Sequence, residues 1–472
     1  MPQACFAARF RSPASGLRRL AAAVILVSVL LPAGALAVPR TWENTGTAFG
    51  TGGNWIGGTA PANNLNDDIG VFANPVVTNN PQLTGNRSIN GLLFNSGTAG
   101  WTFTGGGAGT GTRIFSIGSS GIVNDSANAQ TFSATRLSLA VGANQTWNAA
   151  AGAFSIASAV DLNTFALTLG GNAATNSTIS GVISDSGQII KSGTGTWTLT
   201  GANTYTGATT INQGTLQIGA DNNLGTGSIT VDGGALRTTN TMTITASRSL
   251  SFGAAGGTLD VATGTTLTYD GALAGTGALT KAGTGTFVTG GTDFNSWTGP
   301  LAVNAGTFEI TKQGFVGAID NAAAVTVAGG ATLRFNGNAA YTQETIGSLS
   351  GGGTVVNSGA AAVNFIISGA SNTTFSGVIT DTTNNLNLLK TGTSTLTLSG
   401  SNSYDGVTTI SNGVIIAANN TALGTASNGT TVVSGAGLAL QGGITVTNET
   451  LSVAGTGVGA NGALRNLSGT NT

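Results

Sequence analysis

The sequence has 472 residues, of which 76 are glycine and 7% are charged, and its formal net charge is −1. Histidine is absent and Cys5 is the single cysteine, which excludes Ser-His-Asp triads, Cys-His nucleophiles and zinc sites built from histidine and cysteine. The sequence also lacks the basic stripe that neutralises phosphates, so we expect no nucleic-acid partner. Because 40% of the residues are hydrophobic, the composition favours an ordered chain with a packed core over disorder.

The first segment, residues 1–37, has the pattern of a secretion signal peptide. Its basic region contains four arginines, which are Arg9, Arg11, Arg18 and Arg19. An apolar run over 20–31 follows, and Ala35-Leu36-Ala37 forms a small-residue cleavage site before Val38. The apolar run is shorter than the roughly 20 residues that a membrane-spanning helix needs. We therefore predict export followed by cleavage, and no transmembrane span in the mature segment.

Residues 38–80 are irregular in pattern, and we expect them to cap the N-terminal end of the fold. Trp42 and Trp55 lie here, outside any regular alternation. One interpretation is that the two rings cover the end of the core, and the other is that they are exposed and stack on a sugar ligand; the sequence favours the cap. The pair Asp67-Asp68 is a weak candidate for a calcium site, because its spacing matches no calcium-binding loop.

From residue 81 to residue 472, short runs of alternating apolar and polar residues dominate. The runs over 196–200 and 215–218 alternate with period two, which is typical of half-buried strands. Most runs end at Gly, Asn or Asp, which are favoured in turns. A chain of β-sandwiches is the alternative, but the uniform composition favours a solenoid whose coils pack on their neighbours. We predict an all-β fold, a right-handed parallel β-helix, over 81–472.

The strongest signal is a phrase that occurs three times, at about 191–218, 281–310 and 390–417. The copies read KSGTGTWTLTGANTYTGATTINQGTLQI, KAGTGTFVTGGTDFNSWTGPLAVNAGTFEI and KTGTSTLTLSGSNSYDGVTTISNGVIIA. Each copy has an initial lysine, a turn, a short strand, an aromatic residue followed two positions later by glycine, and another strand. The second copy has two additional residues between its lysine and its aromatic residue.

These copies resemble the autotransporter-associated β-strand repeat of bacterial autotransporter passengers and related large surface proteins. The first copy is close to the family pattern, and the second departs from it most. The resemblance implies a parallel β-helix that contacts the export machinery and is then secreted or displayed on the extracellular face of the outer membrane. It implies no particular activity, because the repeat is a scaffold element. The sequence ends at Thr472 in what reads as mid-repeat sequence, so we expect a truncated C-terminus or an anchor supplied otherwise.

Candidate catalytic and binding residues are few. We interpret the glycine-rich stretches as turns, because no helix follows them. The acidic residues are scattered, although several would form a catalytic cluster if the fold brought them together; these are Asp185, Asp260, Asp270, Asp293 and Asp405. We expect Trp197 in the core, on the apolar phase of its strand. We interpret the repeat lysines, Lys191, Lys281 and Lys390, as solvated charges beside turns that discourage edge pairing.

The leading hypothesis is therefore a non-enzymatic structural or display segment that serves adhesion or self-association, with no cofactor, no metal and no catalytic residue. Its partners would be cell surfaces, polysaccharides or further copies of the chain. The alternative is a carbohydrate-binding or polysaccharide-degrading β-helix. A groove lined by three or more carboxylates or by exposed aromatic rings would favour the alternative, whereas smooth faces with threonine ladders would favour the display segment.

Overall fold

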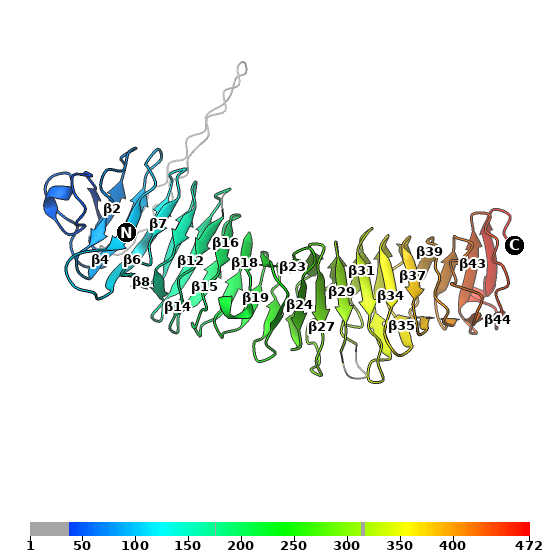
Figure 1. The fold of residues 1–472 in the computed structure, drawn as a ribbon. Helices are drawn as coiled ribbons and strands as arrows, with labels where there is room; N and C mark the ends of the chain where they lie inside the picture. The colour runs from blue at the N-terminus through cyan, green and yellow to red at the C-terminus, as the bar shows by residue number, and fades with distance from the viewer. Residues whose placement is uncertain (1–36, 175, 313–316) are drawn as a thin grey trace, which may run out of the picture. The chain divides into compact units, whose positions relative to one another are not determined.

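The computed structural model describes residues 37–174, 176–312 and 317–472. The expected signal peptide therefore lies, apart from its last residue, outside the described residues. Residues 37–472 form one compact unit, an all-β solenoid of about 18 turns. Figure 1 shows its strands following one another in chain order. The strand pairs of this unit are parallel, so the predicted all-β, parallel solenoid is confirmed.

The long sheet contains one strand from each coil and continues along the whole unit. Its 18 strands pair in the order β3 (Gln82–Leu83), β5 (Thr102–Gly105), β7 (Gln130–Phe132), β10 (Phe154–Ile156), β13 (Ser177–Ile179), β16 (Thr196–Leu199), β18 (Thr215–Ile218), β20 (Ala235–Thr238), β23 (Gly257–Val261), β26 (Leu279–Ala282), β28 (Leu301–Val303), β30 (Ala324–Val327), β33 (Ser348–Gly351), β36 (Thr373–Phe375), β39 (Thr395–Leu398), β41 (Val414–Ala417), β43 (Gly437–Gln441) and β45 (Leu464–Ser468).

Three further sheets supply the remaining faces. The N-terminal sheet contains β1 (Val38–Thr41), β2 (Asp68–Phe72), β4 (Arg87–Phe94), β6 (Arg113–Asn124), β8 (Leu137–Val141), β9 (Gln145–Ala149), β11 (Ala159–Asp161), β12 (Ala166–Gly171), β14 (Ile183–Ser184), β15 (Gln188–Lys191), β17 (Thr209–Ile211), β19 (Ile229–Val231), β22 (Leu250–Phe252) and β25 (Leu273–Gly275). The middle sheet contains β21 (Met242–Ile244), β24 (Thr266–Tyr269), β27 (Thr286–Thr289), β29 (Thr307–Ile310), β31 (Thr332–Phe335), β34 (Thr354–Asn357) and β37 (Val378–Asp381).

The C-terminal sheet contains β32 (Gln343–Ile346), β35 (Val363–Ile367), β38 (Leu386–Lys390), β40 (Thr408–Ile410), β42 (Thr430–Val432) and β44 (Leu451–Val453). Short 3-10 turns occur as η1 (Gly52–Asn54), η2 (Asp221–Asn223) and η3 (Val458–Ala460). Among the described residues, we find no helix with the length and apolar character needed to cross a membrane.

The core is a set of apolar columns inside the coils. In β16 the pattern of intermediate and buried residues alternates, because successive strand residues point to opposite faces. The inward residues stack in register across coils, as in the column of Ile179, Leu199 and Ile218, which are all fully buried. Trp197 is buried in the same way, as its phase predicted. Burial of each such side chain stabilises the fold by about 1.5–3 kcal/mol.

An aromatic cluster closes the N-terminal end of the core. Trp42 and Trp55 are both fully buried, and their ring centroids are 5.1 Å apart at an edge-to-face angle of 84°. Phe49 packs edge-to-face on Trp55 at 5.0 Å and accepts a hydrogen bond from its Nε1 at 2.8 Å. The alternative in which Trp42 and Trp55 are exposed sugar-stacking rings is therefore wrong, because the irregular segment folds back over both rings.

Candidate functional site

Each repeat forms two stacked coils of the solenoid, a unit that we call the repeat module. In the first repeat, β15 pairs with β17 and β16 pairs with β18. The second repeat pairs β26 with β28 and β27 with β29, and the third pairs β38 with β40 and β39 with β41. The lysine strand lies in the N-terminal sheet in the first module, in the long sheet in the second and in the C-terminal sheet in the third. The strand that follows it belongs to the long sheet in the first and third modules and to the middle sheet in the second.

The initial lysine of every module is buried, with an exposed fraction of 0%; these residues are Lys191, Lys281 and Lys390. Our expectation of solvated charges beside turns is therefore wrong. The reason is the phase of the strand: Lys191 follows Ile189 by two positions in β15, so both side chains point inward. The alternation that points Lys191 inward is present in the sequence. The general preference of lysine for water favours the opposite expectation.

Backbone carbonyls of two stacked turns hold the buried ammonium group. Lys191 Nζ donates to the carbonyls of Ser192 at 2.8 Å and Gly193 at 2.7 Å, both in its own turn. It also donates to the carbonyl of Gln213 at 3.1 Å, one coil further along. Since a buried charge needs hydrogen-bond partners to offset its lost hydration, the lysine joins consecutive turns only because three carbonyls converge on it.

The other modules use their lysines in the same position. Lys281 Nζ donates at 2.8, 2.8 and 3.2 Å to three carbonyls, those of Ala282, Gly283 and Ala305. Lys390 Nζ donates to the carbonyl of Gly392. Loss of water around the ammonium group lowers the pKa of each of these three lysines from 10.5 to about 8.

The aromatic residue of each module is also a core residue. Tyr205 and Tyr404 are fully buried, and each hydroxyl lies 2.7 Å from a threonine Oγ1, that of Thr209 or Thr408. Trp297 occupies the same place in the second module and donates from Nε1 to a carbonyl of the preceding coil at 2.7 Å. These rings therefore have a structural role and offer no surface for a ligand.

An asparagine two positions before the aromatic residue links three coils. The Oδ1 atoms of Asn203, Asn295 and Asn402 accept backbone N–H groups of the preceding coil at 2.8–2.9 Å. Their Nδ2 atoms donate to carbonyls of the following coil. This asparagine stands at a fixed distance from the aromatic residue in all three copies, but its role was not predicted from the sequence because it depends on neighbouring coils.

The candidate acidic cluster does not assemble. Asp260 pairs instead with Arg237 at 3.7 Å, and Asp405 accepts a hydrogen bond from Ser427 at 3.2 Å. Within the described ranges, no three histidine, cysteine, aspartate or glutamate side chains come together as a group that could hold a metal ion. The five candidate aspartates therefore form no three-residue cluster of this kind among the described residues.

The adjacent pair Asp67-Asp68 is divided between solvent and interior. Asp67 is exposed and accepts from Asn64 Nδ2 at 2.6 Å. Asp68 is buried, where it pairs with Arg40 at 3.4 Å and accepts the backbone N–H of Ala62 at 2.6 Å. Because one carboxylate faces away from the other, the pair does not form a shared cation site.

A buried acid that the sequence analysis missed lies in β32. Glu344 is fully buried, and its carboxylate accepts from the backbone N–H groups of Ala318 and Ile319, each at 2.9 Å. It also accepts from Tyr341 Oη at 2.7 Å. Burial raises the pKa of Glu344 to about 7, against the opposing effect of these hydrogen bonds. The burial of Glu344 could have been predicted from the alternation of the strand, since Glu344 and Ile346 share its inward face.

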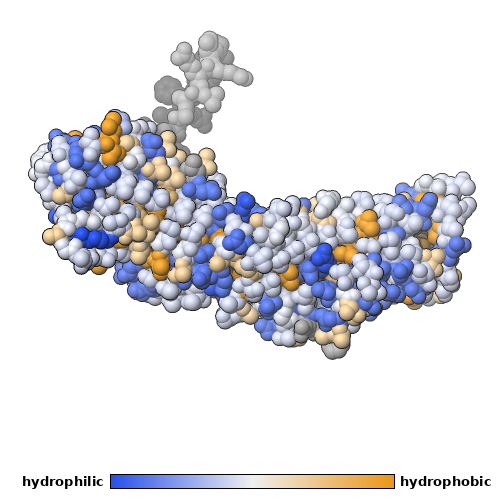
Figure 2. Space-filling model, in the orientation of Figure 1, coloured by the Kyte–Doolittle hydropathy of each residue, from blue (hydrophilic) through white to orange (hydrophobic). Residues whose placement is uncertain are grey.

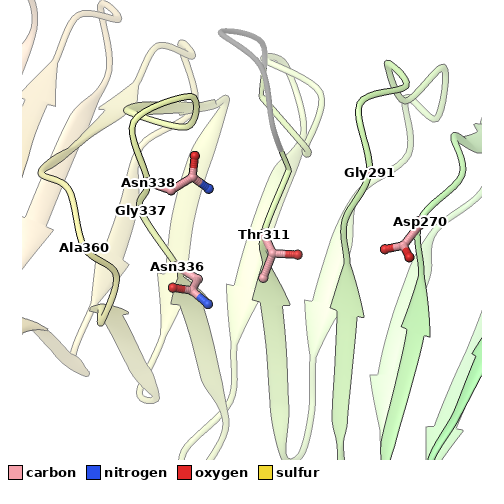
Figure 3. Close-up of a pocket in the computed structure, with 7 residues that line it drawn as sticks. All are labelled: Asp270, Gly291, Thr311, Asn336, Gly337, Asn338 and Ala360. Atoms are coloured by element: carbon pink, nitrogen blue, oxygen red, sulfur yellow. The ribbon is translucent and has the colours of Figure 1, made fainter.

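A groove with mixed polar and apolar walls follows the turns beyond the middle sheet and has a volume of about 510 Å³. Figure 3 shows that its walls come from successive turns after β24, β27, β29, β31 and β34. The lining residues are Asp270, Gly291, Thr311, Asn336, Gly337, Asn338 and Ala360. Among these described residues there is one carboxylate and no aromatic ring, so the groove does not meet the criterion for the carbohydrate-binding or polysaccharide-degrading alternative.

The visible face of the solenoid is mostly of intermediate hydropathy, with hydrophilic and hydrophobic residues interspersed (Figure 2). Hydroxyl groups align between coils on the outer surface, for example Thr230 with Ser251 at 3.0 Å and Thr326 with Ser350 at 2.9 Å. Such pairs fit the smooth, weakly charged faces expected of a display segment.

Comparison with known proteins agrees with the geometry of the modules. The profile of the Passenger-associated-transport-repeat family matches residues 189–218, 279–310 and 388–417. The chain carries three passenger-associated transport repeats. These ranges coincide with the three two-coil modules, and the resemblance inferred from the sequence is confirmed.

One curated relative matches part of the chain. The adhesin BmaC autotransporter of Brucella suis biovar 1 (strain 1330) is 39% identical over 143 residues, which is 30% of this chain. The match spans 4% of the length of that adhesin. No solved structure matches the chain.

Proposed function

We propose that the chain is a non-enzymatic passenger segment, secreted or displayed on the outer surface of a bacterial cell, that serves adhesion or self-association. The observation that carries this proposal is the set of three passenger repeats, each folded as a two-coil module within a parallel solenoid. Residues 1–37 would direct export across the inner membrane and then be removed.

The physical role of the solenoid supports a display function. Each coil packs on its neighbours, so an extended surface is built without a central cavity. The relative with 39% identity is named an adhesin, which favours surface attachment over polysaccharide degradation. The scattered carboxylates and the single-carboxylate groove also favour a binding surface over a catalytic site.

A gene-deletion experiment in the source bacterium tests the function. We expect deletion to reduce cell-to-cell aggregation or attachment to epithelial monolayers and abiotic surfaces, and we expect the full-length gene to restore the lost property. A complementing gene that lacks codons 2–37 is the matched control, because its product would stay inside the cell. If deletion leaves aggregation and attachment unchanged, the proposed function is wrong.

A further inference from the structure

Asparagine followed by glycine occurs five times in the sequence, and this pair carries a chemistry that needs no enzyme. The backbone nitrogen of the glycine can attack the side-chain carbonyl carbon of the asparagine and close a five-membered ring. Glycine favours the reaction, because it has no side chain that hinders the approach of its nitrogen. The five pairs begin at Asn90, Asn336, Asn412, Asn428 and Asn461.

In four of the five pairs, a hydrogen bond to another residue holds the amide nitrogen of the asparagine. The Nδ2 atoms of Asn90 and Asn461 donate to backbone carbonyls at 2.9 and 3.3 Å. Asn336 Nδ2 donates to a carboxylate oxygen at 3.1 Å, and Asn428 Nδ2 donates to the backbone carbonyl of Asp405. Because ring closure turns the amide group and then releases its nitrogen, these four contacts oppose the reaction.

The pair Asn412-Gly413 is the exception. Among the described residues, the Asn412 side chain makes one hydrogen bond, in which its Oδ1 accepts the backbone N–H of Gly413 at 2.7 Å. This contact holds the attacking nitrogen against the carbonyl group that it would attack, and such proximity favours an intramolecular reaction. No described residue accepts from Asn412 Nδ2. Asn412 is also exposed, so water reaches the site.

The same turn in the other two modules lacks this chemistry. The residue before the turn glycine is Gln213 in the first module and Ala305 in the second. Alanine has no amide group, and glutamine would have to close a larger ring. The turn itself is alike in all three modules, because Gly214, Gly306 and Gly413 have φ values of +66°, +64° and +65°. The turn therefore accepts other residues, and the reactive pair is specific to the third module.

We propose that Asn412-Gly413 is a site of spontaneous deamidation, a modification that goes beyond the adhesive function proposed above. The Gly413 nitrogen forms a bond to Cγ of Asn412, and the Cγ–Nδ2 bond breaks. The proton of the glycine nitrogen passes through water to the amide nitrogen, which leaves as ammonia. Water then opens the resulting succinimide. Its attack at Cγ gives aspartate, and its attack at the backbone carbonyl carbon gives isoaspartate, so water is the only other reactant.

Isoaspartate would weaken the third module, because it adds one carbon to the main chain at a tightly packed turn. A Cβ atom at Gly413 would lie 2.2 Å from Ser394 O and 2.5 Å from Gly392 O, so the turn has no spare room. The carbonyl of Gly392 also accepts from the buried Lys390 Nζ. A displaced turn would therefore press on the carbonyl that holds this ammonium group. Aspartate, by contrast, keeps the length of the main chain and adds a charge at an exposed position.

Ageing of the purified, folded chain in mildly alkaline buffer, followed by mass spectrometry, tests the proposed site. Chymotrypsin releases a fragment at 405–423 that contains Asn412 and a neighbouring fragment at 424–438 that contains Asn428. We expect fragment 405–423 to accumulate the deamidated mass before any other fragment that contains an Asn-Gly pair. Asn412→Gln, which copies the first module, should abolish this product. Asn428→Gln is the matched control and should leave its rate of formation unchanged.

The assignment is overturned if a fragment with another Asn-Gly pair reacts first, if no such fragment reacts, or if Asn412→Gln still gains the deamidated mass within 405–423. Urea unfolding tests the consequence for stability. The midpoint of the aged wild type should fall below that of the fresh protein, whereas aged Asn412→Gln and fresh Asn412→Asp should keep the original midpoint. Isoaspartate and aspartate have equal mass, and their chromatographic retention distinguishes them. Equal midpoints for fresh wild type and for wild type converted to isoaspartate would overturn the predicted weakening.

Discussion

The repeat lysines place a positive charge inside an apolar solenoid at one position of every module. The ammonium groups of Lys191 and Lys281 gain backbone carbonyl acceptors from two consecutive turns, and that of Lys390 gains the carbonyl of Gly392 in its own turn. The charged form is nevertheless penalised by burial, since the pKa of each lysine falls to about 8. The balance between hydrogen bonding and lost hydration decides the stability of the module at a given pH.

The first prediction concerns alkaline pH. The folded pKa of these lysines is about 8 and the ordinary value is 10.5, so between these values the unfolded chain binds more protons. Stability should therefore rise as the pH increases from about 8 to 10.5, by up to about 3 kcal/mol per lysine. Urea unfolding across this range measures the effect. Replacement of all three lysines by methionine should flatten the profile, and an unchanged slope in that variant would contradict the account.

The second prediction concerns Glu344, whose pKa is raised to about 7 by burial. Its contribution to stability should be complete below about pH 4.5 and should be lost as the pH rises through 7. Glu344→Gln should remove this part of the pH dependence, whereas the exposed control Glu43→Gln should retain it. The measurement is the urea midpoint of each protein between pH 4.5 and 7.5. Equal pH profiles for the two variants would show that Glu344 is not the responsible group.

The third prediction concerns a turn glycine of the first module. Gly214 has a φ of +66°, and a Cβ atom there would lie 2.6 Å from Gly195 O and 2.8 Å from Lys191 Nζ. Gly214→Ala should destabilise the protein by at least about 1–2 kcal/mol, the usual cost of this backbone conformation for an L-residue. Gly85→Ala is the control, because a Cβ at Gly85 meets no atom within 4 Å. Equal urea midpoints for the two variants would refute this assignment.

At the scale of elements, the repeat module explains why three distant segments share one sequence pattern. Lysine, asparagine and aromatic residue each make contacts to an adjacent coil. The pattern therefore encodes the stacking of two coils. The same two-coil module forms whether the lysine strand belongs to the N-terminal, the long or the C-terminal sheet. This independence of the face fits a scaffold element better than a binding site.

The fourth prediction follows from the insertion in the second module. A variant that lacks Asp293 and Phe294 should fold, because the first and third modules close their coils with two fewer residues. Its far-UV circular dichroism should match that of the wild type, with a modest fall in the urea midpoint because Lys312 Nζ loses the Asp293 carbonyl. A loss of the β signal would mean that the insertion is required for folding.

The local alternation of residues predicts the strands well, but it does not predict the contacts between coils. The alternation over 196–200 and 215–218 corresponds to β16 and β18. The burial of Lys191 depends on the carbonyl of Gln213, which lies one coil away. The direction of that carbonyl cannot be predicted from the local sequence. The groove depends in the same way on which turns become neighbours, since Asp270 and Thr311 lie on either side of Gly290 only in the folded stack.

At the scale of the whole molecule, stability comes from many similar coils and not from one central site. The aromatic cluster of Trp42, Phe49 and Trp55 covers the N-terminal end of the core, where the first coil has no preceding coil to pack on. The long sheet then continues through the chain, while the other faces pass from one sheet to the next. This construction suits a protein whose function is to present a surface.

The central claim is that the proposed passenger segment is presented outside the cell, and labelling of intact cells tests it most directly. Antibodies against residues 37–472 would be applied to living cells of the source bacterium before and after permeabilisation, with an inner-membrane protein as the control for intactness. We predict labelling of intact cells that external protease removes. Labelling that appears only after permeabilisation would contradict the account.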